Sequence, residues 1–520
     1  MGSFYVTTAI PFVNAEPHLG FALELVQADV LARYHRLRGD DTWFLTGTDE
    51  NSLTNVLAAE RAGLPVRALV DRNAAVFGAL ARTLSISNDD FIRTAADARH
   101  REGTRQLWGA CARAGDVYTR AYRGLYCVRC EAFYAPDELV DGRCADHDAT
   151  PEVVEEENYF FRLSRYGERL ADLLDSGALR VRPEWRHHEV RAFVARGLAD
   201  FSISRTRARA RGWGLPVPGD DGQVMYVWFD ALANYITALG YGTDPALLHR
   251  FWLDNSRRVH VIGKNIVRFH AVYWPAMLLS AGLPAPATIV VHGFLNRDGR
   301  RMSKTLGTGV DPAALADAWG PDAVRYWLLR EVPPTEDADY TDAGFARAYA
   351  ADLANDLGNL LQRVVSMLHR YRGGAVPAPG PEAVTPLAAV AAGVPDTLEQ
   401  ALGGGWDPRV ALDAVFAVVR AANRAVEETR PWQLARAERD GDAASARRLD
   451  ATLWELAEAL RIIAEALRPL LPDAAARMAA QLGVTPAARW TDALRWGGLR
   501  PGTRVAGPAP LFPRREPDRL

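Results

Sequence analysis

The first fifty residues switch between short apolar runs and one long run with a helical period. Residues 3–10 (SFYVTTAI) are apolar and rich in β-forming residues, which predicts a strand. Residues 11–20 (PFVNAEPHLG) read as a turn, and residues 21–39 carry a helical apolar period that stops at Gly39. Residues 41–51 (DTWFLTGTDEN) predict a second strand followed by a loop. This order favours an α/β protein with a parallel, nucleotide-binding sheet.

The pattern changes twice further along the chain. Residues 115–150 interrupt it with a cysteine cluster, and strand-like runs resume at 259–264 (VHVIGK) and 288–295 (TIVVHGFL). The later chain consists of long stretches rich in Ala, Leu and Arg, such as 452–472, which predict helices. The Pro- and Arg-rich tail, residues 501–520, is expected to be poorly ordered.

Composition limits the classes of protein that fit. A chain of 520 residues is too long for one core and predicts about three domains. No apolar run approaches the roughly 20 residues that span a bilayer, and the start lacks the basic segment and cleavage site of a signal peptide. We therefore expect a cytoplasmic protein without a membrane partner. Since the net charge is −3, contacts with nucleic acid must come from local patches.

A histidine lies in the turn between the first strand and the first helix. His18, in PHLG, would face the helix N-terminus, where free N–H groups and the helix dipole favour phosphate. Gly20 would let a ligand approach the backbone. A turn histidine is more often a bystander, so this signal is weak alone.

Cysteine and histidine form two closely spaced pairs. Cys127 and Cys130 are spaced C-x2-C, and Cys144 and His147 are spaced C-x2-H, with 13 residues between the pairs. Four such ligands match a closed tetrahedral zinc site, and thiolate and imidazole suit zinc better than a hard cation. A closed site would be structural because no position is left for substrate. Unrelated cysteines beside a surface histidine are the alternative.

Lysine is almost absent from the chain. Lys264 and Lys304 are its only lysines among 61 basic side chains. Chance or codon bias could explain this. The chemical explanation is that a compact ammonium on a flexible stem can follow a moving phosphate, for which a planar guanidinium is less suited.

Taken together and in this order, these motifs resemble those of the methionyl-tRNA synthetases, a family of class I aminoacyl-tRNA synthetases. The resemblance covers residues 4–475. HLGF (18–21) resembles the family's HIGH motif and RMSKT (301–305) its KMSKS motif; the cysteine insertion and the segments 224–236 and 263–276 are also similar. The resemblance implies a Rossmann-type parallel-sheet catalytic domain with an inserted zinc-knuckle connective domain, followed by an α-helical anticodon-binding-like bundle.

The implied domain boundaries follow the changes of pattern. Residues 1–114 and 226–344 would form the two halves of the catalytic domain, the second with the RMSKT loop. Residues 115–225 would hold the connective insertion and the return to the catalytic domain. Residues 345–500 would form the bundle, and residues 501–520 the tail. A monomer is expected.

The resemblance also implies a two-step reaction. The methionine carboxylate attacks the α-phosphate of ATP, bound with Mg²⁺, and forms methionyl-adenylate and pyrophosphate. The terminal adenosine hydroxyl of tRNA then takes the methionyl group. Positioning and electrostatic stabilisation of phosphate charge would drive the first step. The implied catalytic residues are His18, Phe21, Arg301 and Lys304. The implied ATP-binding residues are Asn14, His18, Gly20, Glu24, Lys264, Asn265, His292, Met302, Ser303 and Lys304.

Two further sets of residues carry over from the family. Asp49 would hold the substrate ammonium, and Tyr235 and His270 would approach the thioether, which can accept a hydrogen bond. Asn359 and Arg363, on one helix face, and Trp432, a plane for base stacking, would read the CAU anticodon. Without the resemblance, ordinary core packing would explain the remaining pocket residues: Ala9, Ile10, Phe12, Trp228, Ala231, Leu232, Ile266 and Trp274.

Several positions depart from the family pattern. Phe21 replaces the second histidine of HIGH, and loss of one preorganised donor typically costs about 10²–10³ in rate. Asn51 and Ser52 replace His-Gly, and Asn265 replaces an aspartate; Arg301 and Thr305 are conservative changes.

Three activities therefore stay open. The first is a methionine–tRNA ligase. The second is a paralogue that forms an aminoacyl-adenylate and transfers the aminoacyl group to a small-molecule acceptor. The third is a non-catalytic tRNA-binding module, which would lack ATP–pyrophosphate exchange.

Overall fold

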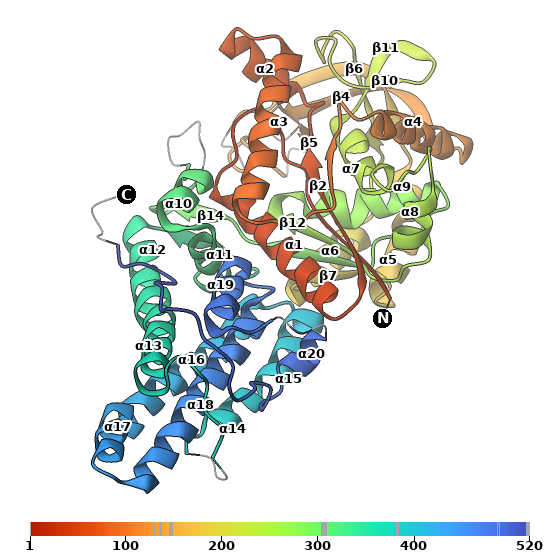
Figure 1. Ribbon diagram of the computed structural model, residues 1–520. Helices are drawn as coiled ribbons and strands as arrows, with labels where there is room; N and C mark the ends of the chain where they lie inside the picture. Colours follow the sequence, from red (N-terminus) through yellow and green to blue (C-terminus); the bar gives the residue numbers. More distant parts are fainter. Residues whose placement is uncertain are drawn as a thin grey trace.

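The computed structural model describes residues 2–128, 131–134, 138–144, 149–302, 309–380, 384–485, 487 and 489–515, without the side chains at positions 132, 133 and 301. The chain forms an α/β half and a helical half, which together make one elongated molecule (Figure 1). The N-terminus enters the α/β half, and the last described residues return from the helical half towards α10 (Figure 1).

A six-stranded parallel sheet forms the centre of the α/β half. Its strand order is β3-β2-β1-β12-β13-β7, with every neighbouring pair parallel. Adjacent side chains on one strand enter different apolar clusters, as Tyr5 and Val6 of β1 do, because strand side chains alternate between faces. The predicted parallel sheet is confirmed. Its strands are β1 (Ser3–Thr8), β2 (Asp41–Thr48), β3 (Asp90–Arg93), β7 (Arg180–Arg182), β12 (Arg258–Gly263) and β13 (Thr288–His292).

Helices cover both faces of this sheet. On one face lies α1, whose side chains are buried nearly all round, even at the polar positions Glu24 and Asp29. The helix begins two residues before the predicted start because His18 caps it. Helix α1 spans Leu19–Leu37, and α3 (Val66–Thr83) lies on the same face of the sheet. The other face is covered by α4 (Ala98–Arg113), α7 (Val227–Thr237) and α9 (Trp274–Ser280).

A second, antiparallel sheet is inserted after α4. Its order is β5-β4-β6-β8, and β4 and β6 pair along almost their whole length, from Val117↔Phe161 to Tyr126↔Glu152. The chain then returns through α5 (Gly167–Asp175) to β7, the edge strand of the main sheet. The inserted strands are β4 (Val117–Cys127), β5 (Ala132–Tyr134), β6 (Glu152–Phe161) and β8 (Phe201–Ser202).

A small sheet and two helices connect the halves. Strand β14 (Leu295–Arg297) pairs with β15 (Arg300–Arg301) and, in parallel, with β16 (Ala338–Tyr340). Helices α10 (Pro312–Trp319) and α11 (Pro321–Arg330) follow the RMSKT segment and pack against the same core as α1.

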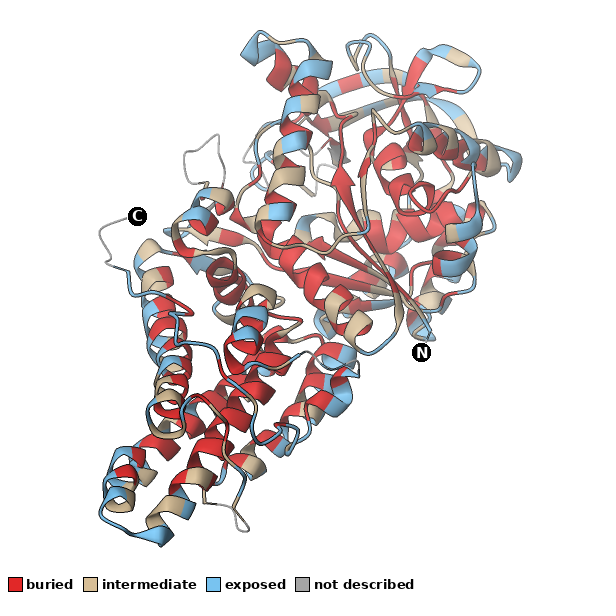
Figure 2. Cartoon of the chain, viewed as in Figure 1, coloured by how far each residue is buried: buried red, intermediate tan, exposed pale blue. Residues whose placement is uncertain are grey.

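The helical half is a bundle around α18, which confirms the long helices predicted there. The central stretch of α18, from Leu449 onward, is buried almost all round, as expected of a helix at the middle of a core. Figure 2 shows this buried band running without a break from the sheet into the bundle. The main helices are α12 (Asp342–Ala348), α13 (Asn359–Arg372), α16 (Pro408–Thr429), α17 (Pro431–Arg439), α18 (Ala443–Leu467), α19 (Pro472–Leu482) and α20 (Trp490–Ala493).

The tail is ordered through residue 515, so the expectation for residues 501–515 was wrong. Its backbone bonds to the loop after α13, with Val376 N donating to Thr503 O and Val505 N donating to Gly374 O. Leu511 and Phe512 are buried against the bundle. A few apolar anchors thus fix a segment whose composition, rich in Pro and Arg, predicted disorder. Residues 516–520 lie outside the described residues.

Within the described part of the chain, no helix is both long and apolar enough to cross a bilayer.

Candidate active site

The candidate site lies where the chain order of the main sheet reverses. From β1 the chain proceeds to β2 and β3 on one side, and it later returns to β12 and β13 on the other. Ligands bind beyond the carboxyl ends of parallel strands at such a switch point. Three predicted residues follow these strand ends: Ala9 after β1, Asp49 after β2 and Lys264 after β12. A bridge between Phe12 and Asp49 joins the first two loops.

The N-terminus of α1 holds His18 in one orientation. The Gly20 backbone N–H donates to Nδ1 of His18 at 3.0 Å, so a neutral ring carries its proton on Nε2. A Cβ at position 20 would lie 2.9 Å from His18 Cε1. Gly20 is therefore needed for this cap, a role the sequence did not reveal. Asn14 is exposed in the loop before it.

The described residues on either side of the RMSKT loop are held by β14 and by α1. Met302 is buried, and its N–H lies 3.3 Å from Leu295 O. After the loop, Val310 O accepts a hydrogen bond from Leu19 N at 3.1 Å, one residue from His18. Ser303 and Lys304 lie outside the described residues, as does the side chain of Arg301. The described chain just after the loop, at Val310, therefore lies against the predicted phosphate-binding turn, whereas Met302 before it is bonded to β14.

Glu24 and His292 form a buried pair under the site. One oxygen of Glu24 accepts from Ala9 N at 2.8 Å, and the other lies 3.0 Å from His292 Nε2. His292 Nδ1 lies 2.8 Å from Gly293 O, so it donates there, and a second proton must lie between Nε2 and the carboxylate. This charge-assisted contact ties α1 and the end of β1 to the end of β13.

Lys264 is already paired in this structure. Its Nζ lies 2.7 Å from Asp337 Oδ2 and 4.4 Å from the centre of the Phe294 ring. Asp337 also accepts from Phe294 N at 2.8 Å. Burial opposes the charged form of Asp337, but the Lys264 ammonium outweighs it, and the net pKa of this carboxyl is lowered. Asn265 is exposed in the same turn.

Phe21 follows Gly20 in the first turn of α1 and packs into the core. Its ring is buried in the core and packs edge-on against Phe77 of α3, with 5.0 Å between the ring centres. One turn earlier on α3, Asn73 donates to Val13 O at 2.6 Å and holds the loop before α1. Packing against α3 is the contact that the structure shows for Phe21.

The residues of the predicted amino-acid pocket gather in one aromatic cluster behind the switch point, which is called the aromatic pocket below. It is lined by α7, by the π-helical segment η5 (Phe269–Tyr273) and by the start of α9, and the rings of Trp228 and Phe269 stack at 3.9 Å. These elements carry Trp228, Ala231, Leu232, Tyr235, His270 and Trp274, with Ala9, Ile10, Phe12 and Ile266 on the loops that follow β1 and β12.

Tyr235 and His270 already use their protons in hydrogen bonds within the protein. Burial lowers the pKa of His270 to about 4, so its ring is neutral near pH 7. Its Nδ1 lies 2.9 Å from Ile266 O and must donate there, so Nε2 accepts from the Tyr235 hydroxyl at 2.7 Å. As arranged here, neither group has a proton for a thioether. Donation to sulfur by these two residues, as expected from the resemblance, would require one of these bonds to break.

Asp49 is a buried carboxyl in an acidic neighbourhood. It is 1% exposed, and burial together with Asp230 and Glu131 raises its pKa well above the usual range. Its Oδ1 accepts from Asn51 N at 3.3 Å. Among the described residues, no basic side chain forms an ion pair with it. A cationic group entering here would supply the missing positive charge.

The residues that depart from the family pattern after Asp49 have structural partners. Asn51 Nδ2 donates to Asp230 Oδ2 at 2.7 Å, and Ser52 caps α2 (Leu53–Ala62) by accepting from Thr54 N. The other oxygen of Asp230 lies 2.6 Å from His100 Nε2. Sequence reasoning missed Asp230 and His100 because their partners lie far away in the chain.

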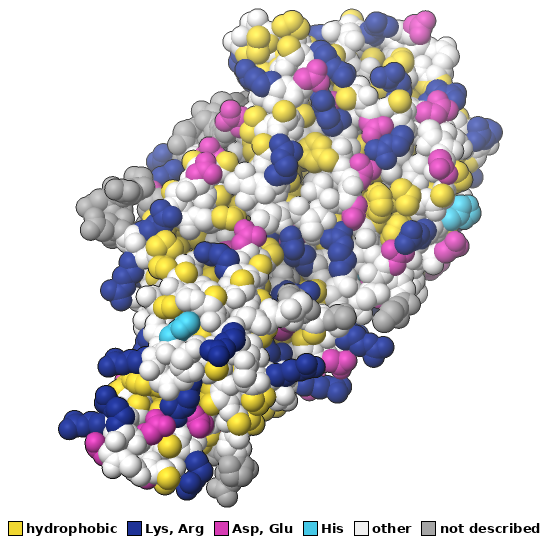
Figure 3. Space-filling model, viewed as in Figure 1, with side chains coloured by type: hydrophobic (Ala, Val, Ile, Leu, Met, Phe, Trp, Pro, Cys, Tyr) yellow, Lys and Arg dark blue, Asp and Glu magenta, His cyan; other side chains and the backbone are white. Residues whose placement is uncertain are grey.

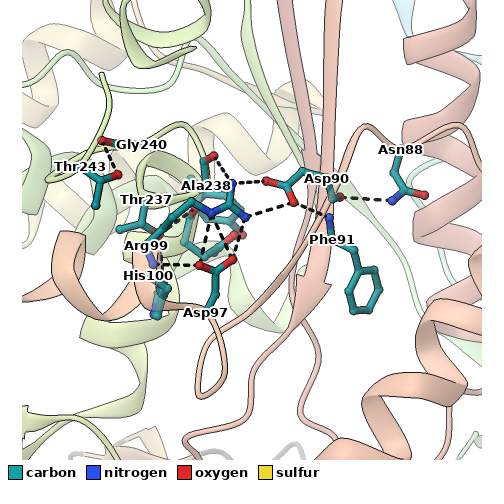
Figure 4. Close-up of polar contacts among 12 residues, drawn as sticks. Asn88, Asp90, Phe91, Asp97, Arg99, His100, Thr237, Ala238, Gly240 and Thr243 are labelled. Carbon is teal, nitrogen blue, oxygen red and sulfur yellow. Dashed lines mark hydrogen bonds and ion pairs between the residues drawn. The ribbon is translucent and has the colours of Figure 1, made fainter. Parts of the chain in front are cut away.

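A polar network fixes α7 against α4. Figure 4 shows Arg99 of α4 reaching Asp90 on β3, Asp97 and the carbonyl of Ala238, while the neighbouring His100 contacts Thr237. The network therefore holds one wall of the aromatic pocket in place.

Part of the predicted metal cluster is described. Cys127, which ends β4, and Cys144 are buried and outside any disulfide. Cys130 and His147 lie outside the described residues, and within the described ones no three metal-binding side chains gather. Two buried thiols at the predicted positions fit the sulfur donors that zinc prefers. Next to Cys130, the Glu131 carboxylate accepts from Thr54 N at 3.2 Å, which ties this loop to α2.

The predicted anticodon residues lie on the bundle, far along the molecule from the sheet. Asn359 is exposed at the start of α13. Arg363, one turn later, pairs with Glu427 of α16 at 2.7 Å. Trp432, at the start of α17, is one of the few exposed large hydrophobic side chains among the described residues. In Figure 1, α17 lies at the end of the bundle away from the α/β half, and α13 and α16 run between it and α11 and α12.

Comparison with known proteins gives consistent matches over the whole chain. A family model described as tRNA synthetases class I (M) matches residues 4–147 and 134–365. A methionine–tRNA ligase of Mycobacterium bovis is 44% identical over 99% of this chain and 99% of its own. One of Brucella suis is 42% identical over 98% of each chain. A structure of Mycobacterium tuberculosis methionyl-tRNA synthetase with methionyl-adenylate matches with a TM-score of 0.92 and 43% identity, over 99% of this chain and 100% of that one.

Proposed function

The chain belongs to the methionyl-tRNA synthetases, class I aminoacyl-tRNA synthetases, and we propose that it activates methionine with ATP and transfers the methionyl group to methionine tRNA. The observation that carries this proposal is the contact between Leu19 N and Val310 O, because it joins the HLGF turn to the chain that follows the RMSKT segment, at the switch point of the sheet. Full-length similarity to methionine–tRNA ligases supports it.

In the proposed reaction, the phosphates of ATP lie at the N-terminus of α1. His18 presents its Nε2 proton there, and the helix dipole favours negative charge. Lys304, on the RMSKT loop, would follow the phosphates as charge develops, and Lys264 would leave Asp337 to reach the nucleotide. Mg²⁺ bound with ATP would neutralise further phosphate charge. The Glu24–His292 pair keeps the strand ends and α1 in register beneath them.

The amino acid occupies the aromatic pocket with its ammonium at Asp49. A buried carboxyl without a cationic partner is costly, and an ammonium relieves that cost. The carboxylate of the substrate would then face the α-phosphate across the switch point. Since the rings of Tyr235 and His270 are mutually bonded, the pocket recognises the side chain chiefly by shape and apolar contact.

Zinc would be held by Cys127, Cys130, Cys144 and His147, and it would supply a rigid crosslink to the inserted sheet. The residues of this chain around it have their own task. Glu131 connects the metal-bearing loop to the start of α2, beside Asn51 and Asp49. Loss of the metal should therefore be felt in amino-acid binding as well as in stability.

The bundle would read the anticodon through Asn359, Arg363 and Trp432. Arg363 must exchange Glu427 for a base, and the exposed Trp432 ring offers a stacking surface. In Figure 3 basic side chains outnumber acidic ones on the visible face of the bundle, which favours contact with nucleic acid despite the net charge of −3. A cytoplasmic monomer that binds methionine, ATP and tRNA completes the proposal.

The other two activities left open by the sequence gain no support from the comparisons. The relatives described above are methionine–tRNA ligases, and the similarity extends over their full length. The test is methionine-dependent ATP–pyrophosphate exchange followed by charging of methionine tRNA. Exchange without charging, and with transfer to a small hydroxyl acceptor, would favour the paralogue instead. Absence of exchange would leave only a binding module.

A further inference from the structure

Arg325 of α11 lies buried at the junction of the two halves. Its side chain and that of Asp29 on α1 are both 0% exposed, and Nη1 of Arg325 lies 2.7 Å from Oδ2 of Asp29. Charged side chains are almost never buried to this extent unless they are paired. The pair is separate from the groups assigned to ATP, methionine or the anticodon.

The guanidinium connects three further backbone positions. Nε donates to Leu470 O at 2.9 Å, Nη2 to Pro469 O at 3.4 Å and Nη1 to Leu84 O at 3.2 Å. Leu470 and Pro469 form the turn between α18 and α19 of the bundle, and Leu84 ends α3. One rigid, planar group thus joins α1, α3 and the bundle, which a single ammonium could not do with the same geometry.

Neighbouring contacts reinforce this junction. Asp29 also accepts from Ser87 N at 2.7 Å, on the segment between α3 and β3. At the N-terminus of α19, Ala474 N donates to Asp322 Oδ2 at 2.5 Å. Helix α19 is therefore held against α11 at the same place where α11 is held against α1. The angle between α1 and the bundle is fixed by buried, directional bonds rather than by apolar packing alone.

We propose that Arg325 is a positioning residue for the tRNA step, which sets the orientation of the bundle relative to the helix that begins at His18. The inference rests on the proposed function. Adenylate formation uses groups of the α/β half only, whereas a tRNA must contact the distal bundle and the sheet edge together. An error in this angle should therefore harm transfer to tRNA and spare activation.

The test compares Arg325→Lys with the wild-type protein. Lysine keeps a positive charge beside Asp29 but loses the planar guanidinium that donates to the carbonyls of Pro469 and Leu470. We expect methionine-dependent pyrophosphate exchange within about twofold of wild type and a fall of at least tenfold in kcat for tRNA charging, with little change in KM for tRNA. Arg330→Lys is the control, because Arg330 lies on the same helix in a partly exposed pair with Asp413. It should leave both rates unchanged.

Two results would overturn the proposal. One is unchanged charging by Arg325→Lys. The other is an equal loss of exchange and charging, which indicates a general structural role. If the lysine variant does not fold, the isosteric Asp29→Asn variant takes its place. Its rates of pyrophosphate exchange and tRNA charging are then compared in the same way. Failure of the wild-type protein to charge methionine tRNA would instead overturn the proposed function.

Discussion

The ring of Phe21 packs edge-on against the ring of Phe77, with 5.0 Å between their centres, and both are buried. We therefore expect Phe21→His to lower stability, because it leaves a polar ring in an apolar contact at a cost of about 1–3 kcal/mol. Thermal unfolding should report the loss, and methionine-dependent exchange should not rise. Phe77→Leu is the matched control, since it loosens the same contact without adding a polar group. A rise in exchange above about threefold for Phe21→His, or roughly 0.65 kcal/mol, would show that position 21 faces the phosphates after all.

Asp49 should make methionine binding depend on pH. Its carboxyl has a raised pKa in the empty site, and the substrate ammonium prefers the carboxylate. Affinity should therefore increase from about pH 5 to pH 7, where the amino group stays protonated. Asp49→Asn should weaken binding at least tenfold and abolish this dependence. Isothermal titration over that range measures both, and a pH-independent affinity in the wild type would contradict the assignment.

The same residue should lower the stability of the empty protein. A carboxyl whose pKa is higher in the folded than in the unfolded state binds more protons when folded, so stability falls as pH rises above about 4. Asp49→Asn keeps a group that can accept from Asn51 N and removes the buried charge. At pH 7 the variant should melt at a higher temperature than the wild type while failing to activate methionine. A lower melting temperature would mean that the carboxylate is stabilised by something other than substrate.

Metal removal should impair amino-acid activation. We expect one zinc per chain, and chelation should lower both thermal stability and the exchange rate, because Glu131 ties the metal-bearing loop to α2. Cys144→Ser should reproduce this effect. Cys111→Ala is the control, since Cys111 lies in the α/β core and its Sγ contacts Met277 O. Substoichiometric zinc in freshly purified protein would contradict the prediction.

Lys304 should act mainly in the transition state. Lys304→Ala should slow exchange by about 10²-fold or more while methionine affinity stays nearly unchanged. Lys304→Arg should recover only part of the rate, because a planar fork cannot follow the phosphates as a compact ammonium does. Full recovery by arginine would show that charge alone matters and that the scarcity of lysine in this chain is accidental.

Local patterns predicted the elements, and the motifs predicted where they meet. The apolar run at residues 3–10 and the helical period after it became β1 and α1, and Lys264 follows the end of β12 at the expected sheet edge. The cap formed by His18 was hidden, because it depends on the close approach of Gly20 to the ring.

What the sequence could not predict are partners far away in the chain. In PDAVRYWLLR, Arg325 reads as an ordinary polar position of an amphipathic helix, yet it binds three distant segments of the chain. Likewise, nothing in the tail indicated that Leu511 and Phe512 would find an apolar site on the bundle. The mutual bond of Tyr235 and His270 is a further example, because proton positions follow from geometry and not from residue type.

The apolar core that holds α1 also contains side chains of α11, α13, α16 and α18, so it crosses the junction of the two halves around the buried Arg325–Asp29 pair. Separating the two halves would expose a large hydrophobic surface on each fragment. Heat or denaturant should accordingly melt sheet and bundle in one cooperative transition. Neither half can readily be replaced by an unrelated domain during evolution, because each half forms part of the hydrophobic core of the other.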